Sequence, residues 1–427
     1  MARPFDTEIK SIPTSSSASV AAPSEFGRVH KTMTTAYSRE RKLLVLVSLL
    51  FSWMLANADR IAMTIAIIPI TQEFRLDAQS AGYVLSAFYV SYALMQLGGG
   101  WLSDRFGSRG VLVGCVAAWS VFTGMTGLAG SLGVLLVVRF LFGIGEGAFN
   151  PASSVAISEV FPKKERARAK AVVTGAIFIG GALGTGSIAA LIHNYGWRVA
   201  YHVLGFIGIA MALVLWFAIG KVRPRDRNSG AQREPKFRPL LRMALMRKTT
   251  LIYFFSNTVL IGLISWMPTF LVKTRHIDVV HAGFASTVPY IVAFVSLNIV
   301  GWMLDKFGYG RERLFLAIGG VWIVVFLALM TMSASLTMVL TFWTLSMVGS
   351  TIVYGTVWAI PLTHLPDEMV GTGSGIINFG GQVAAAVAPA VIGLLVDFAH
   401  GSFTPAFLFL LGSGVALILV GLTWRSK

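Results

Sequence analysis

Four ionisable residues lie inside long apolar segments of this sequence: Asp59, Arg60, Arg139 and Glu146. A charged side chain at the centre of a membrane helix costs about 2.5–3.5 kcal/mol, so such groups face the protein interior and pair with one another. A guanidinium offers planar donors that match a carboxylate, and burial favours the neutral form of a carboxyl group. We therefore expect Arg60 to bind an anion and Glu146 to carry a proton. The alternative is a static ion-pair network that holds helices together.

The spacing of these residues predicts how they pair. Arg139 and Glu146 are seven residues apart, so they share one helix face about two turns from each other. The neighbours Asp59 and Arg60 point about 100° apart and cannot both face one partner. Arg60 falls between Arg139 and Glu146 in depth, so we expect Asp59 to pair with Arg139 and Glu146 with Arg60. An anion that reached Arg60 would release Glu146 and thereby couple proton uptake to anion binding.

The composition tells which elements must position these residues. Of the 427 residues, 55% are hydrophobic and 13% are charged, and the mean hydropathy is +0.72. Soluble domains carry about 25% charged residues, so a soluble fold is excluded. In a membrane each backbone polar group must pair locally, which predicts an all-α integral membrane protein. We count twelve apolar runs as transmembrane helices: 43–70, 81–102, 110–129, 132–158, 169–192, 199–219, 250–271, 282–303, 313–332, 336–361, 371–397 and 403–424.

The net charge of +16 follows the membrane topology. With the N-terminus in the cytosol, 29 of the 35 Lys and Arg residues face the cytosol and only four face the opposite side. This asymmetry predicts that both termini are cytosolic. The basic excess therefore requires no nucleic-acid partner. The expected location is the plasma membrane, as a multi-pass protein, which is the inner membrane if the source is Gram-negative.

Polar segments divide the chain into four predicted regions. Residues 1–42 are rich in Ser, Thr and Ala, lack the apolar core of a secretory signal, and are expected to form a disordered cytosolic tail. Residues 220–249 form the one long interior loop, a basic cytosolic linker. The linker separates an N-terminal six-helix bundle over 43–219 from a C-terminal six-helix bundle over 250–427.

A repeated motif relates the two bundles. The chain reads Gly-Trp-Leu-Ser-Asp-Arg-Phe-Gly-Ser-Arg over 100–109 and Gly-Trp-Met-Leu-Asp-Lys-Phe-Gly over 301–308, a constant offset of 201 residues. Both copies end the second helix of their half. Two homologous six-helix bundles related by an internal repeat are therefore expected. Such halves commonly rock about a site near the bilayer midplane.

This motif and the six-plus-six layout resemble the major facilitator superfamily over residues 43–424. The resemblance implies that the motif locks a cytosolic gate; the alternative is that it only shapes a tight turn. The gating residues are Asp104, Arg105 and Arg109, with Asp305 and Lys306 in the second copy.

Three segments further resemble the anion:cation symporter family, which includes D-galactonate and hexuronate permeases and sialin-like carriers. They are Asn57–Arg60, Arg139–Phe149 and Gly371–Gln382. The resemblance implies that Asp59 and Glu146 are proton-linked carboxylates, with Arg139 in the same network. It also implies that Arg60 meets the substrate carboxylate. The residues that it places along the cavity are Tyr92, Trp358 and Asn378.

Two positions depart from the sugar-acid pattern: Asn57 stands where those permeases have Tyr, and Ile177 where they have Gln. Loss of that amide removes a partner for hydroxyl groups. This disfavours a polyhydroxylated acid and leaves open an aromatic or short-chain carboxylate. Asn378 and Gln382 share a helix face and must face protein or cavity, so hydrogen bonding between helices remains an equal alternative for both. The substrate-binding candidates are Arg60, Tyr92, Trp358, Asn378, Gln382 and Asn57.

The residues favour a secondary active transporter that takes up a small organic anion with protons by alternating access. The alternatives are a proton-driven drug or metabolite exporter, since an acid in the first span also suits cation antiport, and a spinster-like lipid carrier. No phosphate loop, nucleophile–base pair or metal motif is present in the sequence, so neither an enzyme nor a cofactor is expected. The expected partners are the anion, protons and membrane lipid, and the expected state is a monomer.

Overall fold

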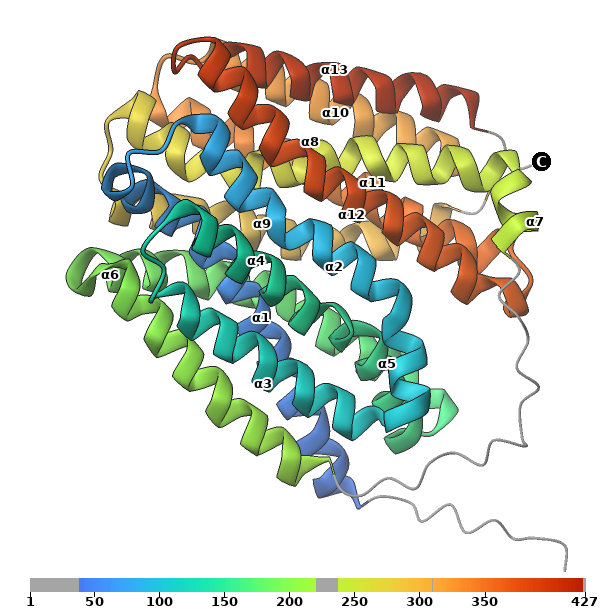
Figure 1. The fold of residues 1–427 in the computed structure, drawn as a ribbon. Helices are drawn as coiled ribbons and strands as arrows, with labels where there is room; N and C mark the ends of the chain where they lie inside the picture. The colour runs from blue at the N-terminus through green and yellow to red at the C-terminus, as the bar shows by residue number, and fades with distance from the viewer. Residues whose placement is uncertain (1–37, 220–236, 309, 425–427) are drawn as a thin grey trace, which may run out of the picture. The chain divides into compact units, whose positions relative to one another are not determined.

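The computed structural model describes residues 38–219, 237–308 and 310–424, and in these ranges the regular structure is entirely α-helical (Figure 1). The helices are α1 (Arg39–Glu73), α2 (Ala78–Phe106), α3 (Ser108–Thr126), α4 (Leu132–Gly147), α5 (Phe149–Val160), α6 (Lys163–Ala218), α7 (Phe237–Arg242), α8 (Ala244–Arg275), α9 (Val279–Phe307), α10 (Glu312–Met332), α11 (Leu336–His364), α12 (Asp367–Phe398) and α13 (Thr404–Thr423).

These helices make the twelve predicted spans. The helices α4 and α5 together form the fourth span, and α6 contains the fifth and the sixth. The two arms of α6 meet at Gly196, whose φ of 81° and ψ of 159° interrupt the helix. Glycine adopts this conformation without the steric cost of a side chain. Ten segments of the described chain are long and apolar enough to cross a membrane, one of them most of α6. The expected all-α membrane fold is confirmed.

Some helices extend beyond the apolar runs and begin at polar residues that cap them. The predicted run 81–102 lies within α2, which begins after Asp77, whose side chain accepts a hydrogen bond from the Ser80 backbone N–H at 2.7 Å. Asp278 caps α9 in the same way, accepting from the backbone N–H of Val280 at 2.9 Å. Such caps satisfy backbone N–H groups of the first helical turn that have no partner within the helix. The ends of an apolar run therefore do not mark the ends of a helix.

The predicted tail and linker fall largely outside the described residues. Residues 1–37 and 220–236 belong to that part of the chain. Within the remainder of the predicted linker, the structure forms the short helix α7 and the first turns of α8. The boundaries of the two bundles therefore stay predictions.

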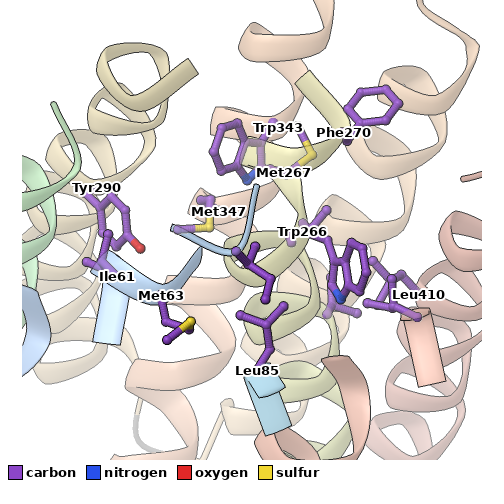
Figure 2. Close-up of a cluster of buried hydrophobic side chains, with 14 of the residues drawn as sticks. Ile61, Met63, Leu85, Trp266, Met267, Phe270, Tyr290, Trp343, Met347 and Leu410 are labelled. Carbon is purple, nitrogen blue, oxygen red and sulfur yellow. The ribbon is translucent and has the colours of Figure 1, made fainter. Parts of the chain in front are cut away.

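The two halves of the chain pack against each other through a buried apolar cluster (Figure 2). The residues labelled there come from α1, α2, α8, α9, α11 and α13: Ile61, Met63, Leu85, Trp266, Met267, Phe270, Tyr290, Trp343, Met347 and Leu410. Those of α1 and α8 lie in the later part of each helix, toward Glu73 and Arg275. We call this end of the bundle the Glu73 side.

Close helix contacts also seal the Glu73 side. The helices α2 and α12 run side by side (Figure 1), and Gly82 of α2 lies directly against Pro389 and Gly393 of α12. We call the opposite end of the bundle the Phe106 side, and large side chains are exposed there. Phe106 ends α2 with 61% of its surface exposed, and Trp302 near the end of α9 is 58% exposed. The described residues thus join the halves by apolar packing on the Glu73 side.

Candidate functional site

Arg60 and Glu146 form a buried ion pair between α1 and α4. The Arg60 guanidinium donates through Nη2 to Glu146 Oε1. The Glu146 side chain is 0% exposed and that of Arg60 is 16% exposed. This is one of the two pairs that the sequence predicts, and it is confirmed. A buried pair of this kind contributes little net stability, but it leaves an uncompensated charge when one partner is removed.

Three aromatic rings surround the Arg60 guanidinium. Its central carbon lies 4.5 Å from the ring centroid of Tyr92, 5.0 Å from that of Phe88 and 5.5 Å from that of Trp53. The Arg60 Nε atom is buried and has no hydrogen-bond partner in the described structure. The rings favour a cation over their faces and fix its orientation, while part of the donor set stays unused. Arg60 is therefore held in place and keeps one N–H donor that no described residue uses.

Asp59 has a different partner from the one predicted. Its Oδ2 atom accepts a hydrogen bond from the Thr123 hydroxyl of α3 at 3.2 Å, and its Oδ1 atom has no partner among the described residues. No direct ion pair between Asp59 and Arg139 forms among the described residues, although Arg139 lies within electrostatic range of Asp59. The Arg139 guanidinium carbon lies 4.8 Å from the ring centroid of Phe142. Sequence reasoning missed Thr123, since a hydroxyl within an apolar run gives no sign of its partner.

Glycines around Glu146 allow α4 to approach its neighbours. Gly143 lies against the backbone of α2. A Cβ atom placed on Gly145 would lie 3.0 Å from the backbone nitrogen of Trp119 in α3. A side chain at either position would collide with that backbone. The close approach places the carboxylate of Glu146 against Arg60, and α4 ends one residue later at Gly147.

The second half contributes a cluster of aromatic rings. The ring centroid of Tyr253 in α8 lies 5.8 Å from that of Trp358 and 6.1 Å from that of Tyr354, both in α11. Tyr92 of α2 lies within electrostatic range of Tyr253, without a ring contact between the two. The indole N–H of Trp358 is buried and lies toward the Tyr253 hydroxyl group.

Amide side chains connect helices in this region, one of them across the halves. Asn378 of α12 donates to the Gln96 side chain of α2. Asn257 of α8 donates to the Gly381 carbonyl at 2.6 Å. The Gln382 Oε1 atom is buried and has no partner among the described residues. Asn378 therefore bonds between helices, and the cavity role of Gln382 stays a prediction.

The remaining two positions noted in the sequence analysis are less engaged. Asn57 is buried and donates to the Trp53 carbonyl of its own helix at 2.7 Å. Ile177 lies in the first arm of α6 and is half-buried. The structure thus brings Arg60, Tyr92 and Glu146 together, and it occupies the amide of Asn57 locally.

The predicted gating residues lie at the Phe106 side. Arg109 donates to the Trp216 carbonyl at 2.7 Å, and its guanidinium carbon lies 4.0 Å from the Trp216 ring centroid. Lys306 lies over the rings of Trp302 and Phe307, at 5.2 Å from each centroid. Arg105 and Asp305 are exposed, and the side chain of Asp104 is outside the described residues. Their gating role stays a prediction.

Two polar contacts on the Phe106 side were not anticipated. Ser108, which begins α3, donates to Glu159 of α5. In the second half, Glu312 begins α10 and His364 ends α11. The Glu312 Oε1 atom lies 3.8 Å from the His364 Nε2 atom. The described residues contain no group of three or more His, Cys, Asp or Glu that could hold a metal ion.

The fold and the site together agree with a comparison against protein families. The profile of the Major Facilitator Superfamily matches residues 44–389. The chain belongs to the Major Facilitator Superfamily. Several relatives of the chain are named as transporters. The chain is therefore a multi-pass membrane transporter rather than an enzyme.

Curated relatives in the superfamily cover most of the chain. The probable sulfoacetate transporter SauU of Cupriavidus necator is 29% identical, over 87% of this chain and 91% of that protein. The hexuronate transporter of Bacillus subtilis is 28% identical, over 88% and 92%. The D-galactonate transporter of Escherichia coli O6:H1 is 28% identical, over 88% and 94%.

A solved structure shows the same fold. The bacterial homologue of the human lysosomal transporter Spinster, in an inward-facing and occupied conformation, superposes with a TM-score of 0.76. The match covers 91% of this chain and 97% of that one at 20% sequence identity. This identity supports a common fold and carries nothing about substrate.

Proposed function

We propose that the chain is a secondary transporter that takes up a small organic anion together with protons. The observation that carries the proposal is the ion pair between Arg60 and Glu146, which is buried within the spans. The relatives named for sulfoacetate, hexuronate and D-galactonate transport support an anionic substrate. Intramembrane ionisable groups commonly mark substrate or proton pathways.

The pair couples the two ligands through competition. The substrate carboxylate accepts hydrogen bonds from the Arg60 guanidinium and takes the place of Glu146. Glu146 then remains buried without its counter-charge, and it takes a proton to become neutral. When the anion leaves, the guanidinium attracts Glu146 again, and the proton departs. Asp59 precedes Arg60 on α1 and accepts a hydrogen bond from the Thr123 hydroxyl of α3. It is the second candidate proton-linked group.

Alternating access gives this exchange a direction. With both termini in the cytosol, the Glu73 side faces outward and the Phe106 side faces inward. The apolar cluster of Figure 2 then lies toward the outer side, and Phe106 and Trp302 lie toward the inner side. The gating residues Arg109 and Lys306 lie on that inner side. Rocking of the two halves would exchange the closed and open ends.

The proposal is tested by flux in proteoliposomes with the full-length chain. Labelled carboxylates are supplied with and without an inward proton gradient to the wild type, Arg60→Ala and Glu146→Gln. We expect gradient-driven accumulation in the wild type only. The matched control is Glu73→Gln, which removes a partner of Arg198 from an exposed ion pair and should leave accumulation unchanged. Accumulation that survives in Glu146→Gln would contradict the coupling role.

A second candidate function is transport of a lipid, and one observation favours it. A cavity of about 420 Å³ lies between α1 and both arms of α6, with an apolar lining that includes Met54, Ala58, Gly184 and Ile207. An acyl chain fits such a lining. Lipid transport predicts flux of a labelled lysophospholipid that survives in Arg60→Ala, whereas anion transport predicts that no such flux occurs.

The placement in the membrane is also a proposal. The distribution of Lys and Arg supports a plasma-membrane protein with both termini in the cytosol. Because Cys115 is the one cysteine, a Cys115→Ser background permits single cysteines to be placed near Lys427. A membrane-impermeant thiol reagent should label such a cysteine in inverted vesicles and not in intact cells. Cross-linking and light scattering test the expected monomer.

A further inference from the structure

The fourth span is interrupted next to Glu146. The helix α4 ends at Gly147, and α5 begins two residues later at Phe149. Pro151 explains the interruption, because proline has no N–H to donate to the Gly147 carbonyl and its ring collides with that carbonyl in a continuous helix. The equivalent span of the second half, α11, is one unbroken helix. The interruption therefore belongs to the half that carries the buried acid.

The end of α4 is fixed to α1 and α2. The Glu146 carboxylate is paired with Arg60 of α1. A Cβ atom placed on Gly147 would lie 3.0 Å from the Tyr92 carbonyl oxygen of α2, so the absence of a side chain permits this close approach. Neutralising Glu146 removes the attraction between charges and leaves the packing. The hold of α1 on the end of α4 therefore depends on the charge of Glu146.

The start of α5 is fixed separately, to α6. The Lys170 ammonium of α6 donates to the Asn150 side-chain oxygen at 2.7 Å, to the Ser153 hydroxyl at 2.9 Å and to the Asn150 carbonyl at 3.3 Å. An ammonium group has three N–H donors, so these contacts use all of them. The acceptors are neutral groups of the first turn of α5. This connection therefore does not depend on the charge of Glu146.

The helix α5 connects the site with the Phe106 side. At its start, the Phe149 ring stacks on Trp53 of α1 with 5.4 Å between centroids. The Trp53 ring centroid in turn lies 5.5 Å from the Arg60 guanidinium carbon. At the other end of α5, Glu159 accepts a hydrogen bond from Ser108, which lies within the repeated motif that carries the predicted gating residues. One helix thus spans the distance between the ion pair and the motif.

We propose that the break between α4 and α5 is a hinge of the transport cycle and that Lys170 sets its resting angle. While Glu146 is paired with Arg60, both sides of the break are held. When Glu146 leaves Arg60, the end of α4 is released while α5 stays tied to α6, and the angle between the two helices changes. A few residues at the end of an element can absorb such a change. The inference rests on the proposed function, since it describes how exchange at Arg60 reaches the gating motif.

The hinge angle is measured by double electron–electron resonance on the purified full-length chain in a Cys115→Ser background. Spin labels are attached at Val137→Cys in α4 and Ser154→Cys in α5, two exposed positions on either side of the break. The positions are about 25 Å apart along a straight helix, and a bend shortens this distance. We expect Glu146→Gln, which stands for the neutral acid, to shift the distance distribution. Lys170→Met should broaden it, because the start of α5 loses its connection to α6.

Pro151→Ala supplies the missing N–H and favours a continuous helix. It should abolish the shift that Glu146→Gln causes, and it should slow carboxylate flux about tenfold while the half-saturating concentration stays within about twofold. The unfolding temperature should not fall, because alanine is the better helix former. A merely structural role of Pro151 predicts instead that rate and stability are lost together. The matched control is Pro361→Ala within the unbroken helix α11, which should leave the flux unchanged.

The outcomes separate the hinge from the proposed function. A distance distribution that does not respond to Glu146→Gln would overturn the hinge, and so would wild-type flux in Pro151→Ala. If gradient-driven accumulation occurs but the distance stays fixed, the anion site stands and the hinge fails. If the wild type carries no carboxylate, the proposed function fails, and the distance measurement still shows whether neutralising Glu146 moves α5. Lys170→Met keeps the hinge testable if Pro151→Ala does not fold.

Discussion

The two halves of this chain share an ancestry in sequence and divide the work at the site. The first half places Asp59, Arg60, Arg139 and Glu146 inside its spans. The predicted spans of the second half carry charge only at their margins, at Arg313 and Asp397. Between these margins the second half contributes rings and amides. One copy of the repeat thus holds the buried charges, and in our proposal these bind the anion and exchange the proton while the other copy supplies rings and amides.

A smaller difference appears where the same helices end on the Phe106 side. In the first half, the start of α3 meets the end of α5 through Ser108 and Glu159. In the second half, the start of α10 meets the end of α11 through Glu312 and His364. Each copy places an acidic residue at this contact between two helix ends. In the first half the acid ends α5, and in the second half it begins α10. The repeat therefore preserves the position of a polar contact better than the residues that make it.

The largest expected effect comes from breaking the charged pair in the first half. Arg60→Ala leaves Glu146 buried without its partner, which should destabilise the protein by about 3–5 kcal/mol. The double variant Arg60→Ala/Glu146→Gln removes the stranded charge and should recover part of that loss. Thermal unfolding followed by tryptophan fluorescence measures both. A double variant no more stable than Arg60→Ala would show that the pair does not compensate the charge.

The next effect concerns the donor that holds Asp59. Thr123→Val keeps the volume of the side chain and removes the hydroxyl group that donates to Asp59 Oδ2. The carboxylate then has no hydrogen-bond donor in the described structure, and we expect a loss of about 1–3 kcal/mol in unfolding free energy. Thr123→Ser, which keeps the hydroxyl group, is the control. Equal stability of the Val and Ser variants would contradict the contact.

A weaker effect is expected at the amide contact between the halves. Gln96→Leu and Asn378→Leu each remove one side of the hydrogen bond between α2 and α12. Hydrogen bonds between membrane helices average about 0.6 kcal/mol, with a maximum of about 1.7 kcal/mol. The double variant should therefore lose less stability than the sum of the two single variants. Additive losses would mean that the two amides act independently.

Much of the fold could be predicted from the sequence because a membrane imposes a simple length rule. The twelve apolar runs and the pair of Arg60 with Glu146 followed from hydropathy, spacing and the cost of buried charge. The partner of Asp59 did not follow, because spacing gives the depth of a side chain and its angle to neighbours on the same helix, but not which other helix that face meets. The contact of Asn378 with Gln96 joins residues 282 positions apart, and neither sequence position indicates the other.

The central claim is that an anion displaces Glu146 from Arg60 and thereby makes Glu146 take up a proton. The most direct test uses purified protein in weakly buffered detergent solution. An indicator dye reports the protons that the protein takes up from solution when a carboxylate that binds the wild type is added. We predict uptake of about one proton per anion bound to the wild type. Glu146→Gln should bind the anion with much smaller uptake. Unchanged proton uptake in Glu146→Gln would contradict the account.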